Sequence, residues 1–273
     1  MSQLLLKAEV TKLARLLQTD EKPLRFLEKE SVPHLRALRA ACNHALHQGD
    51  SKLFHRLAAS TKIMPSALVA VIAKAAMGPT LCSRVTGLLD PDKAVDISKR
   101  LPVPFLAQVT LELDPSRARP VLQRMPLDII VAVAKQQVRD GHYITMARFV
   151  DDLTDEAIDA VSDALSDADI LRVGAYVESQ KRLDELINRL SDERLRGTLR
   201  AAAKEPEVLW DWTLVIWEGV SAKTRKRLGD LALLEEQAMI SMAKTLKKQG
   251  LWDAMLATAA DMSPATQKKL KSI

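Results

Sequence analysis

The chain contains few aromatic residues, few glycines and only two cysteines. Aromatics make up 4% of its 273 residues, and there are 9 glycines. Alanine and leucine dominate instead, which suits helices and argues against a fold rich in β-strands. Cys42 and Cys82 are too few to build a disulfide framework, so we expect both to be reduced, as in a cytoplasmic protein.

Long apolar runs and a secretory leader are also missing from the sequence. No run approaches the roughly 20 apolar residues that a bilayer-spanning helix needs, so we expect no membrane span. The segment from Met1 to Lys7 has no basic region before its apolar residues and no small-residue cleavage site. It is therefore not a secretory signal, and we expect a cytoplasmic location.

The sequence carries none of the common catalytic motifs. We find no P-loop, no glycine-rich dinucleotide turn, no Gly-x-Ser-x-Gly and no HExxH. There are 5 histidines, and four of them precede residue 56, which leaves little material for general-base chemistry. We therefore expect a protein that is not an enzyme and that uses no cofactor.

What the chain does contain is a series of short blocks between residues 88 and 165. Each block ends in Leu or Met, and the next begins at once with Asp, Ser, Thr or Pro. The block ends recur at intervals of twelve residues, at Leu89, Leu101, Leu113 and Met125 and again at Leu153 and Leu165. The regular spacing indicates a repeated structural unit.

Each block has the pattern of a short amphipathic helix. Apolar residues stand four and seven positions before each block end, as Val109 and Leu106 do before Leu113, and these positions share one helical face. The residues that begin the blocks are good helix N-caps or fit the first helical turn. Helices of about ten residues are marginal alone and must pack on their neighbours. We therefore predict an all-α fold, a right-handed α-superhelix or α-solenoid of short antiparallel helices; an irregular helical domain is the alternative.

The helical pattern extends beyond these blocks. Residues 2–18 carry apolar residues at helical spacing, with Lys12 on another face. Residues 65–77 and 126–140 are more uniformly apolar and end at Gly78 and Gly141, which predicts two buried helices with glycine stops. We expect a repeat array over residues 1–203, regular over 78–203, and a helical extension over 204–273 packed on that array.

Three segments resemble the repeat of a known domain: Leu88–Ala94, Glu112–Ala118 and Asp152–Ala157. Their pattern is similar to that of the cytosolic N-terminal domain of MgtE-type magnesium transporters, and the flagellar rotor switch protein has similar right-handed superhelical repeats. The resemblance covers roughly residues 78–203 and implies a fold. In the transporters acidic residues of this domain help to sense magnesium, but no residue of this chain matches a ligand motif, and the transporter function does not carry over.

The acids of the chain are concentrated in one stretch. The net charge is +5, yet residues 151–169 hold eight acids and no Lys or Arg. Oxygen ligands at adjacent helix starts could bind a divalent cation, which makes Asp151, Asp152, Asp155 and Glu156 weak metal candidates. A simpler interpretation is that these residues cap helices and keep their outer faces solvated. A third interpretation is that they form a docking surface for a basic partner.

A second metal candidate has less support. The soft or borderline ligands Cys42, His44, His47 and His55 lie close together in sequence. Their spacing matches no zinc signature, so we interpret them as ordinary helical residues.

Two further sets are candidate binding residues. Trp210, Trp212 and Trp217 lie within one predicted helix, as core anchors or as part of a protein-binding patch. Lysines and arginines of the basic carboxyl-terminal third could contact nucleic-acid phosphates, although solvated helix faces explain them equally simply. The nucleic-acid candidates are Lys223, Arg225, Lys226, Arg227, Lys247 and Lys248.

These observations rank three functions. The first is a protein-interaction or regulatory module built from helical repeats, with another protein as the main expected partner and a homodimer also compatible with the sequence. The second is association with nucleic acid through the basic carboxyl-terminal third. The third is sensing of a divalent cation through residues 151–169.

Overall fold

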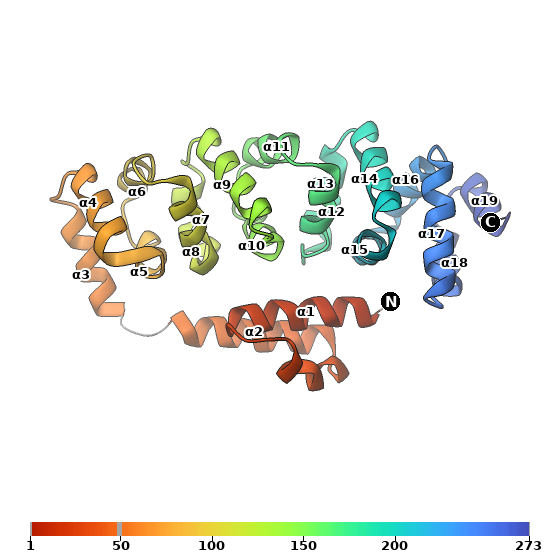
Figure 1. Cartoon of the computed structure of the whole chain (residues 1–273), viewed down its shortest axis with the longest axis horizontal. Helices are drawn as coiled ribbons and strands as arrows, with labels where there is room; N and C mark the ends of the chain where they lie inside the picture. Colours follow the sequence, from red (N-terminus) through yellow and green to blue (C-terminus); the bar gives the residue numbers. More distant parts are fainter. Residues whose placement is uncertain (1, 48–50, 273) are drawn as a thin grey trace. The chain divides into compact units, whose positions relative to one another are not determined.

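The computed structural model of the chain describes the backbone of residues 2–47 and 51–272 (Figure 1). Over these residues the protein is all-α, with nineteen α-helices and no β-strand, as the composition predicts. The helices form two compact units, described separately below. Unit 1 comprises Met1–Arg36 and Ser166–Ile273, and unit 2 comprises Ala37–Leu165. The expected division at residue 204 stays a prediction.

Unit 2 contains the regular blocks. Its elements are α3 (Ser51–Thr61), α4 (Ser66–Ile72), the π-helical η2 (Ala73–Met77), α5 (Gly78–Thr86), α6 (Pro91–Ser98), α7 (Val103–Glu112), α8 (Pro115–Leu122), α9 (Leu127–Arg139), α10 (Tyr143–Phe149) and α11 (Asp155–Ala164). Helix α2 (Val32–His47) begins in unit 1 and runs into unit 2.

Unit 1 joins the amino-terminal helix to the last third of the chain. Its elements are α1 (Ser2–Leu16), the 3₁₀-helix η1 (Lys22–Lys29), α12 (Asp167–Gly174), α13 (Gln180–Arg189), α14 (Asp192–Lys204), α15 (Pro206–Gly219), α16 (Ala222–Ala232), α17 (Glu236–Lys248), α18 (Trp252–Thr258), the 3₁₀-helix η3 (Ala259–Asp261) and α19 (Pro264–Ser272).

The predicted block starts are helix N-caps. The side chain of Asp90 accepts a hydrogen bond from the amide of Lys93 at the start of α6, and Thr154 accepts one from the amide of Ala157 at the start of α11. Such caps satisfy amides that have no partner within the helix and contribute about 1 kcal/mol each. The helical interpretation of the blocks is therefore confirmed.

The block ends face the interior, as their apolar character requires. Leu113 and Leu165 are buried, and Leu101 packs on the cluster formed by Val69, Ala70 and Ile97. Within unit 2 most helices pack on the next helix but one along the chain, and α10 packs on α9. Helices α3, α5, α7, α9 and α11 contact one another in succession and form one row, and α4, α6 and α8 do the same and form another. These pairwise contacts account for the stability of helices too short to persist alone. The right-handed superhelix is a finer statement and stays a prediction.

The glycine stop predicted at Gly141 is confirmed. Helix α9 ends there with a φ of +72°, and the amide of His142 donates to the carbonyl of Gln137 at 2.8 Å. A positive φ is costly for residues with a Cβ, because the side chain approaches the backbone oxygen.

Replacing Gly141 with alanine is expected to lower the free energy of unfolding by about 1 kcal/mol. A Cβ at this position would meet no atom within 4 Å, so the cost comes from backbone conformation and not from a clash. Urea denaturation would measure it, with Gly141→Asn as the matched variant because asparagine tolerates this conformation better. Equal losses for both variants would contradict the explanation.

The segment predicted as one buried helix at residues 65–77 differs from expectation. It forms α4 followed by the π-helical turn η2, and it exposes 48% of Leu68 and 63% of Val71. Helix α4 is the first member of its row, so α6 covers one side of it while no preceding helix of the row covers the other. The prediction of a fully buried helix was therefore wrong.

The same region corrects a second expectation. The helical stretch Ser66–Thr86 has 21 residues and reaches a mean hydropathy of 1.4, so by length and composition it could cross a membrane. Only 28% of its most apolar window is buried within the protein. Our sequence expectation that no run approaches this threshold was therefore wrong for this stretch.

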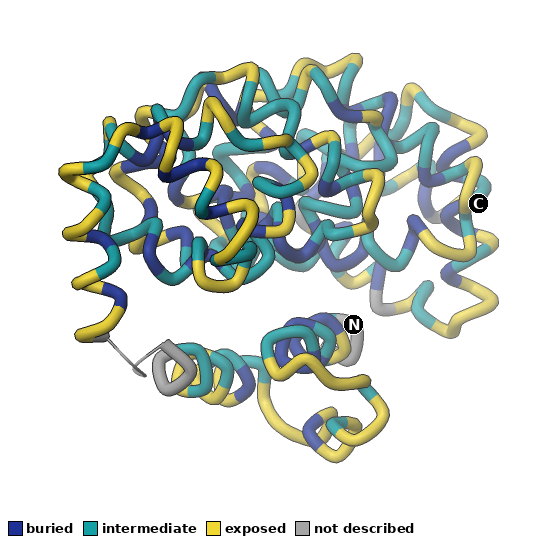
Figure 2. The backbone as a smooth tube through the Cα atoms, turned by 60° about the vertical axis from the view of Figure 1, so that its left-hand side comes forward, coloured by how far each residue is buried: buried dark blue, intermediate teal, exposed yellow. Residues whose placement is uncertain are grey.

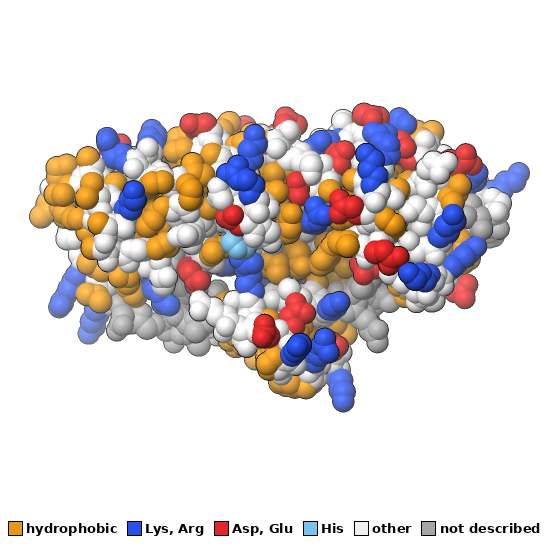
Figure 3. Space-filling view, in the orientation of Figure 1, with side chains coloured by type: hydrophobic (Ala, Val, Ile, Leu, Met, Phe, Trp, Pro, Cys, Tyr) orange, Lys and Arg blue, Asp and Glu red, His pale blue; other side chains and the backbone are white. Residues whose placement is uncertain are grey.

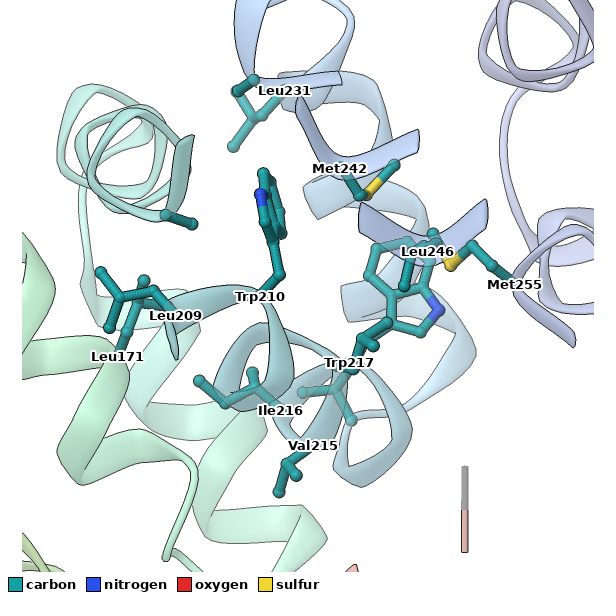
Figure 4. Close-up of a cluster of buried hydrophobic side chains, with 14 of the residues drawn as sticks. Leu171, Leu209, Trp210, Val215, Ile216, Trp217, Leu231, Met242, Leu246 and Met255 are labelled. Atoms are coloured by element: carbon teal, nitrogen blue, oxygen red, sulfur yellow. The ribbon is translucent and has the colours of Figure 1, made fainter. Parts of the chain in front are cut away.

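Unit 1 has a larger core than the clusters of unit 2. Buried residues from α12 to α19 form one continuous cluster, centred on α15 (Figure 4). Trp210 and Trp217 point from α15 toward α17, where Met242 and Leu246 lie beside them. Helix α15 also packs on α12, α14 and α17, which explains why it is apolar on most of its surface.

Candidate functional site

The most distinctive surface of unit 1 is the one on which α1 docks. Helix α1 packs on α15, and its Leu5 packs against the large core cluster. Val10, Leu13 and Ala14 are each no more than 3% exposed, as a helix packed by its apolar face requires. The first helix of the chain thus packs on η1 and on α15, a helix that follows residue 165.

Two charged residues of α1 are buried with these apolar side chains. Glu9 is 2% exposed and Lys12 is 7% exposed. The Lys12 Nζ lies 3.1 Å from the Glu9 carboxylate and 3.0 Å from that of Glu178, which lies between α12 and α13. The Arg36 Nε lies 3.1 Å from Glu9. We call these four residues the α1 ion cluster.

The α1 ion cluster constrains how α1 can dock. Burial of a charge is costly unless an opposite charge compensates, and removal of one partner leaves the other uncompensated. A shift of α1 by one residue along its axis would carry Lys12 away from Glu178. The cluster therefore selects one register for α1, whereas apolar contacts alone would tolerate several.

An aromatic pair lies on the same side of the core. The rings of Tyr176 and Trp212 lie with centroids 5.0 Å apart and planes tilted by 49°. Burial raises the pKa of Tyr176 to about 12, and the nearby carboxylate of Glu21 contributes to the same increase. Trp212 is half-buried against the core cluster. Of the three tryptophans predicted to bind a partner, it is the one that is not fully buried.

The other two tryptophans are buried in unit 1. Trp210 is 1% exposed and donates from its indole nitrogen to Ser241 at 3.1 Å. Trp217 is 7% exposed and donates to Thr258 at 3.0 Å. Their positions match the core-anchor interpretation, and a partner-binding role for this helix stays a prediction that depends on Trp212.

Most of the predicted nucleic-acid residues have partners within unit 1. Arg227 contacts Asp192 at 2.6 Å and donates to the carbonyls of Ile187 and Leu190. The remaining contacts are Lys226 with Asp230 at 2.7 Å, Lys248 with Glu207 at 3.1 Å, Arg225 with the Val220 carbonyl at 3.2 Å, and Lys247 over the Trp252 ring at 5.3 Å. Lys223 is exposed. Phosphate binding by this set would compete with these contacts, and it stays a prediction.

Carboxylates that join neighbouring helices of unit 1 give a prediction about pH. Burial raises the pKa of Asp184, but hydrogen bonds from Thr224 and Ser221 together outweigh it, so the pKa lies below its ordinary value of 3.8. A lowered pKa in the folded state contributes stability above the unfolded value, and this contribution is lost as the pH falls through the folded value.

The thermal stability of Asp184→Asn is therefore expected to converge on that of the parent protein only as the pH falls below 3.8 and through the lowered pKa of Asp184. At neutral pH the variant should have a lower melting temperature than the parent. The neutral side-chain amide of asparagine accepts weaker hydrogen bonds from the Ser221 amide and the Thr224 hydroxyl than the carboxylate does. Melting curves between pH 2 and 7 would test this. A difference in melting temperature that stays constant with pH would contradict it.

The acidic candidates lie in unit 2 and do not converge. Asp152 is buried and forms an ion pair with Arg119 at 2.7 Å, whereas Asp151, Asp155 and Glu156 are exposed. Over the described residues no group of three or more His, Cys, Asp or Glu side chains is placed to hold a metal ion. Asp155 and Glu156 occupy the first turn of α11, where carboxylates stabilise the helix dipole.

Of the histidine and cysteine candidates, the structure describes the side chains of Cys42 and His55. Cys42 is half-buried, and the side chains of His44 and His47 lie outside the described residues. His55 lines a small cavity of about 80 Å³ in unit 2, together with Ser83, Arg84, Asp114 and Arg117 among others. This cavity holds only a few water molecules, which is too little for a typical organic ligand.

Comparisons of the chain with protein-family models, with curated proteins and with solved structures found no match.

Proposed function

We propose that the chain is a non-enzymatic, cytoplasmic protein of helical repeats that binds other proteins, and that the surface of unit 1 around α15 recognises an amphipathic helix. The observation that carries this proposal is the docking of α1. Apolar contacts and ion pairs from Lys12 and Arg36 hold this helix, which is a common mode of recognition between an amphipathic helix and an apolar groove.

The remainder of the molecule fits this role. The contacts between alternate short helices in unit 2 support an α-solenoid like that of the MgtE-type N-terminal domain, and such arrays offer extended surfaces to protein partners. Trp212 supplies a half-buried aromatic anchor beside the core, and tryptophan is enriched among residues that dominate binding energy.

Site-specific photo-crosslinking would test the proposal. With p-benzoylphenylalanine in place of Trp212, irradiation of the full-length protein in its native cells is expected to yield an adduct with another protein. Mass spectrometry should place the crosslinked peptide in an amphipathic helical segment of that protein. The same amino acid at Lys223, which is exposed on α16, provides the control position.

A variant that weakens the contact of α1 with the rest of unit 1 provides a second test. Lys12→Glu places a negative charge beside Glu9 and Glu178, so α1 should be released and the yield of adduct should rise. Crosslinks that join only Trp212 to α1 of the same chain, in the parent and in the variant, would refute the proposal. An adduct with a second copy of the chain would identify the partner as a homodimer.

A further inference from the structure

An apolar surface remains exposed at the first helices of unit 2. Of eleven large hydrophobic side chains that are exposed among the described residues, five lie between residues 53 and 81. They are Leu53, Ile63, Leu68, Val71 and Leu81, with exposures from 37% to 89%. We call the outer side of α3, α4, η2 and α5 the α3–α5 surface; hydrophobic side chains gather over α4 and α5 in Figure 3.

The charges of this surface have a single sign. Residues 51–89 contain five Lys or Arg and no Asp or Glu. Lys52, Arg56, Lys62 and Lys74 are exposed, and none of them forms an ion pair with another described residue. Arg84 lies over the ring of Phe54 at 5.9 Å. The complementary surface must therefore be anionic.

The helices of this region are buried on one side only. Val69, Ala70 and Ala73 face the interior of unit 2, and Val69 and Ala70 pack with Ile97 of α6. Leu68, Val71 and Lys74 alternate with them and are exposed, and the outer turns of α3 are exposed as well (Figure 2). A helix with one face in the protein and an apolar, lysine-flanked face outside has the arrangement of a helix that lies in a membrane interface.

The stretch Ser66–Thr86 is apolar enough to cross a bilayer, but its inner contacts favour a surface position. Spanning would require α4 to leave α6 and α5 to leave α7, with loss of the Val69–Ile97 packing. Binding at the interface keeps these contacts and covers only the side chains that are already exposed.

We propose that the α3–α5 surface docks on a membrane that contains anionic lipids. The aliphatic side chains Leu53, Ile63, Leu68 and Val71 enter the boundary between headgroups and acyl chains, and Lys52, Arg56, Lys62 and Lys74 contact lipid phosphates. Large exposed aliphatics favour lipid over an acidic protein surface, since residues that dominate protein interfaces are more often aromatic or arginine. This inference does not depend on the function proposed for unit 1.

Vesicle sedimentation with the purified full-length chain tests the proposal. We expect binding to phosphatidylcholine vesicles that contain about 30% phosphatidylserine, and weaker binding to pure phosphatidylcholine or at high salt, because counterions screen surface charge. Lys62→Glu with Lys74→Glu should weaken binding at least tenfold, since each basic residue near an anionic surface contributes roughly fivefold. Val71→Asp should weaken it by a comparable factor.

Matched variants in unit 1 distinguish an effect of the α3–α5 surface from a general effect of net charge or hydrophobicity on vesicle binding. Lys244→Glu with Lys268→Glu makes the same change in net charge at exposed positions of unit 1, and Leu234→Asp alters a side chain that is 62% exposed there. Both should bind vesicles like the parent, and circular dichroism should show all variants folded. The proposal fails if the parent does not sediment with anionic vesicles, or if the unit 1 variants lose binding as much as the α3–α5 variants. It also fails if the parent binds only an acidic protein, captured through the same residues in the absence of lipid.

Discussion

Replacing Trp210 with alanine is expected to lower the free energy of unfolding by about 3–5 kcal/mol, the largest effect of any single substitution considered for this protein. Trp210 is 1% exposed and lies in the large core cluster of unit 1, between Leu231 and Met242 (Figure 4). Removal of the indole leaves a cavity that short, interlocked helices can close only in part. It also leaves the Ser241 hydroxyl without the donor that now lies 3.1 Å away.

Urea or thermal denaturation, followed by circular dichroism, measures this effect. Trp212→Ala is the matched control on the same helix, because Trp212 is half-buried and a smaller part of its surface leaves the core. We expect it to cost less than half as much. A loss below about 1 kcal/mol for Trp210→Ala would show that α15 is not the centre of a tightly packed core.

Replacing Glu9 with alanine is expected to cost about 3 kcal/mol and to loosen α1 selectively. Glu9 compensates the charges of both Lys12 and Arg36, and Lys12 is itself 7% exposed. Without Glu9, the Lys12 ammonium retains only Glu178, whose side chain is 34% exposed and therefore screened by water.

Hydrogen exchange resolves this loss along the chain. Amides of α1 should exchange faster in Glu9→Ala, while those of α7 and α9 in unit 2 keep their protection. Glu28→Ala, at an exposed glutamate of η1, is the control and should change nothing. The double variant Glu9→Ala with Lys12→Ala should cost less than the sum of the single variants, as coupled charges require. Strict additivity would contradict the proposed pairing.

The blocks of unit 2 were predictable because their information is local. An apolar residue at each block end and a capping residue after it specify where a helix stops and the next one starts, as Leu113 and Asp114 illustrate. The periodicity also identified the faces that pack, since Ala118 and Val121 are buried where the offsets predicted them. Neither inference requires knowledge of distant parts of the chain.

The α1 docking surface was not predictable by the same argument. The apolar spacing of residues 2–18 predicts a helix, but Lys12 was placed on another face, whereas it is buried with Glu9. Its partner Glu178 lies 166 residues later, and nothing in the local pattern of either residue indicates the other. The local sequence did offer one signal: Glu9 and Lys12 are oppositely charged, stand three positions apart, and are flanked by the apolar residues Ala8, Val10 and Leu13.

Exposure at the start of unit 2 escaped prediction for a related reason. The apolar composition of residues 65–77 suggested that the helix is buried. Composition shows that a helix could be buried, but it does not show whether a neighbouring helix is present to cover it. As α4 is first in its row, Leu68 and Val71 remain exposed. Similarly, the spacing of Trp210 and Trp217 placed them on one face without deciding between core and contact surface.

The sequence separation of 166 between Lys12 and Glu178 has a consequence during synthesis. A ribosome adds roughly 5–20 residues per second, so about ten seconds or more separate the appearance of α1 from that of its binding surface. Over this interval α1 can contact η1 and pair Glu9 with Arg36, but the helix α15 on which it later docks has not yet been made. A chaperone or an assembling subunit that reaches α1 in this period does not compete with α15 or Glu178, whereas one that arrives after release from the ribosome must first displace α1 from them.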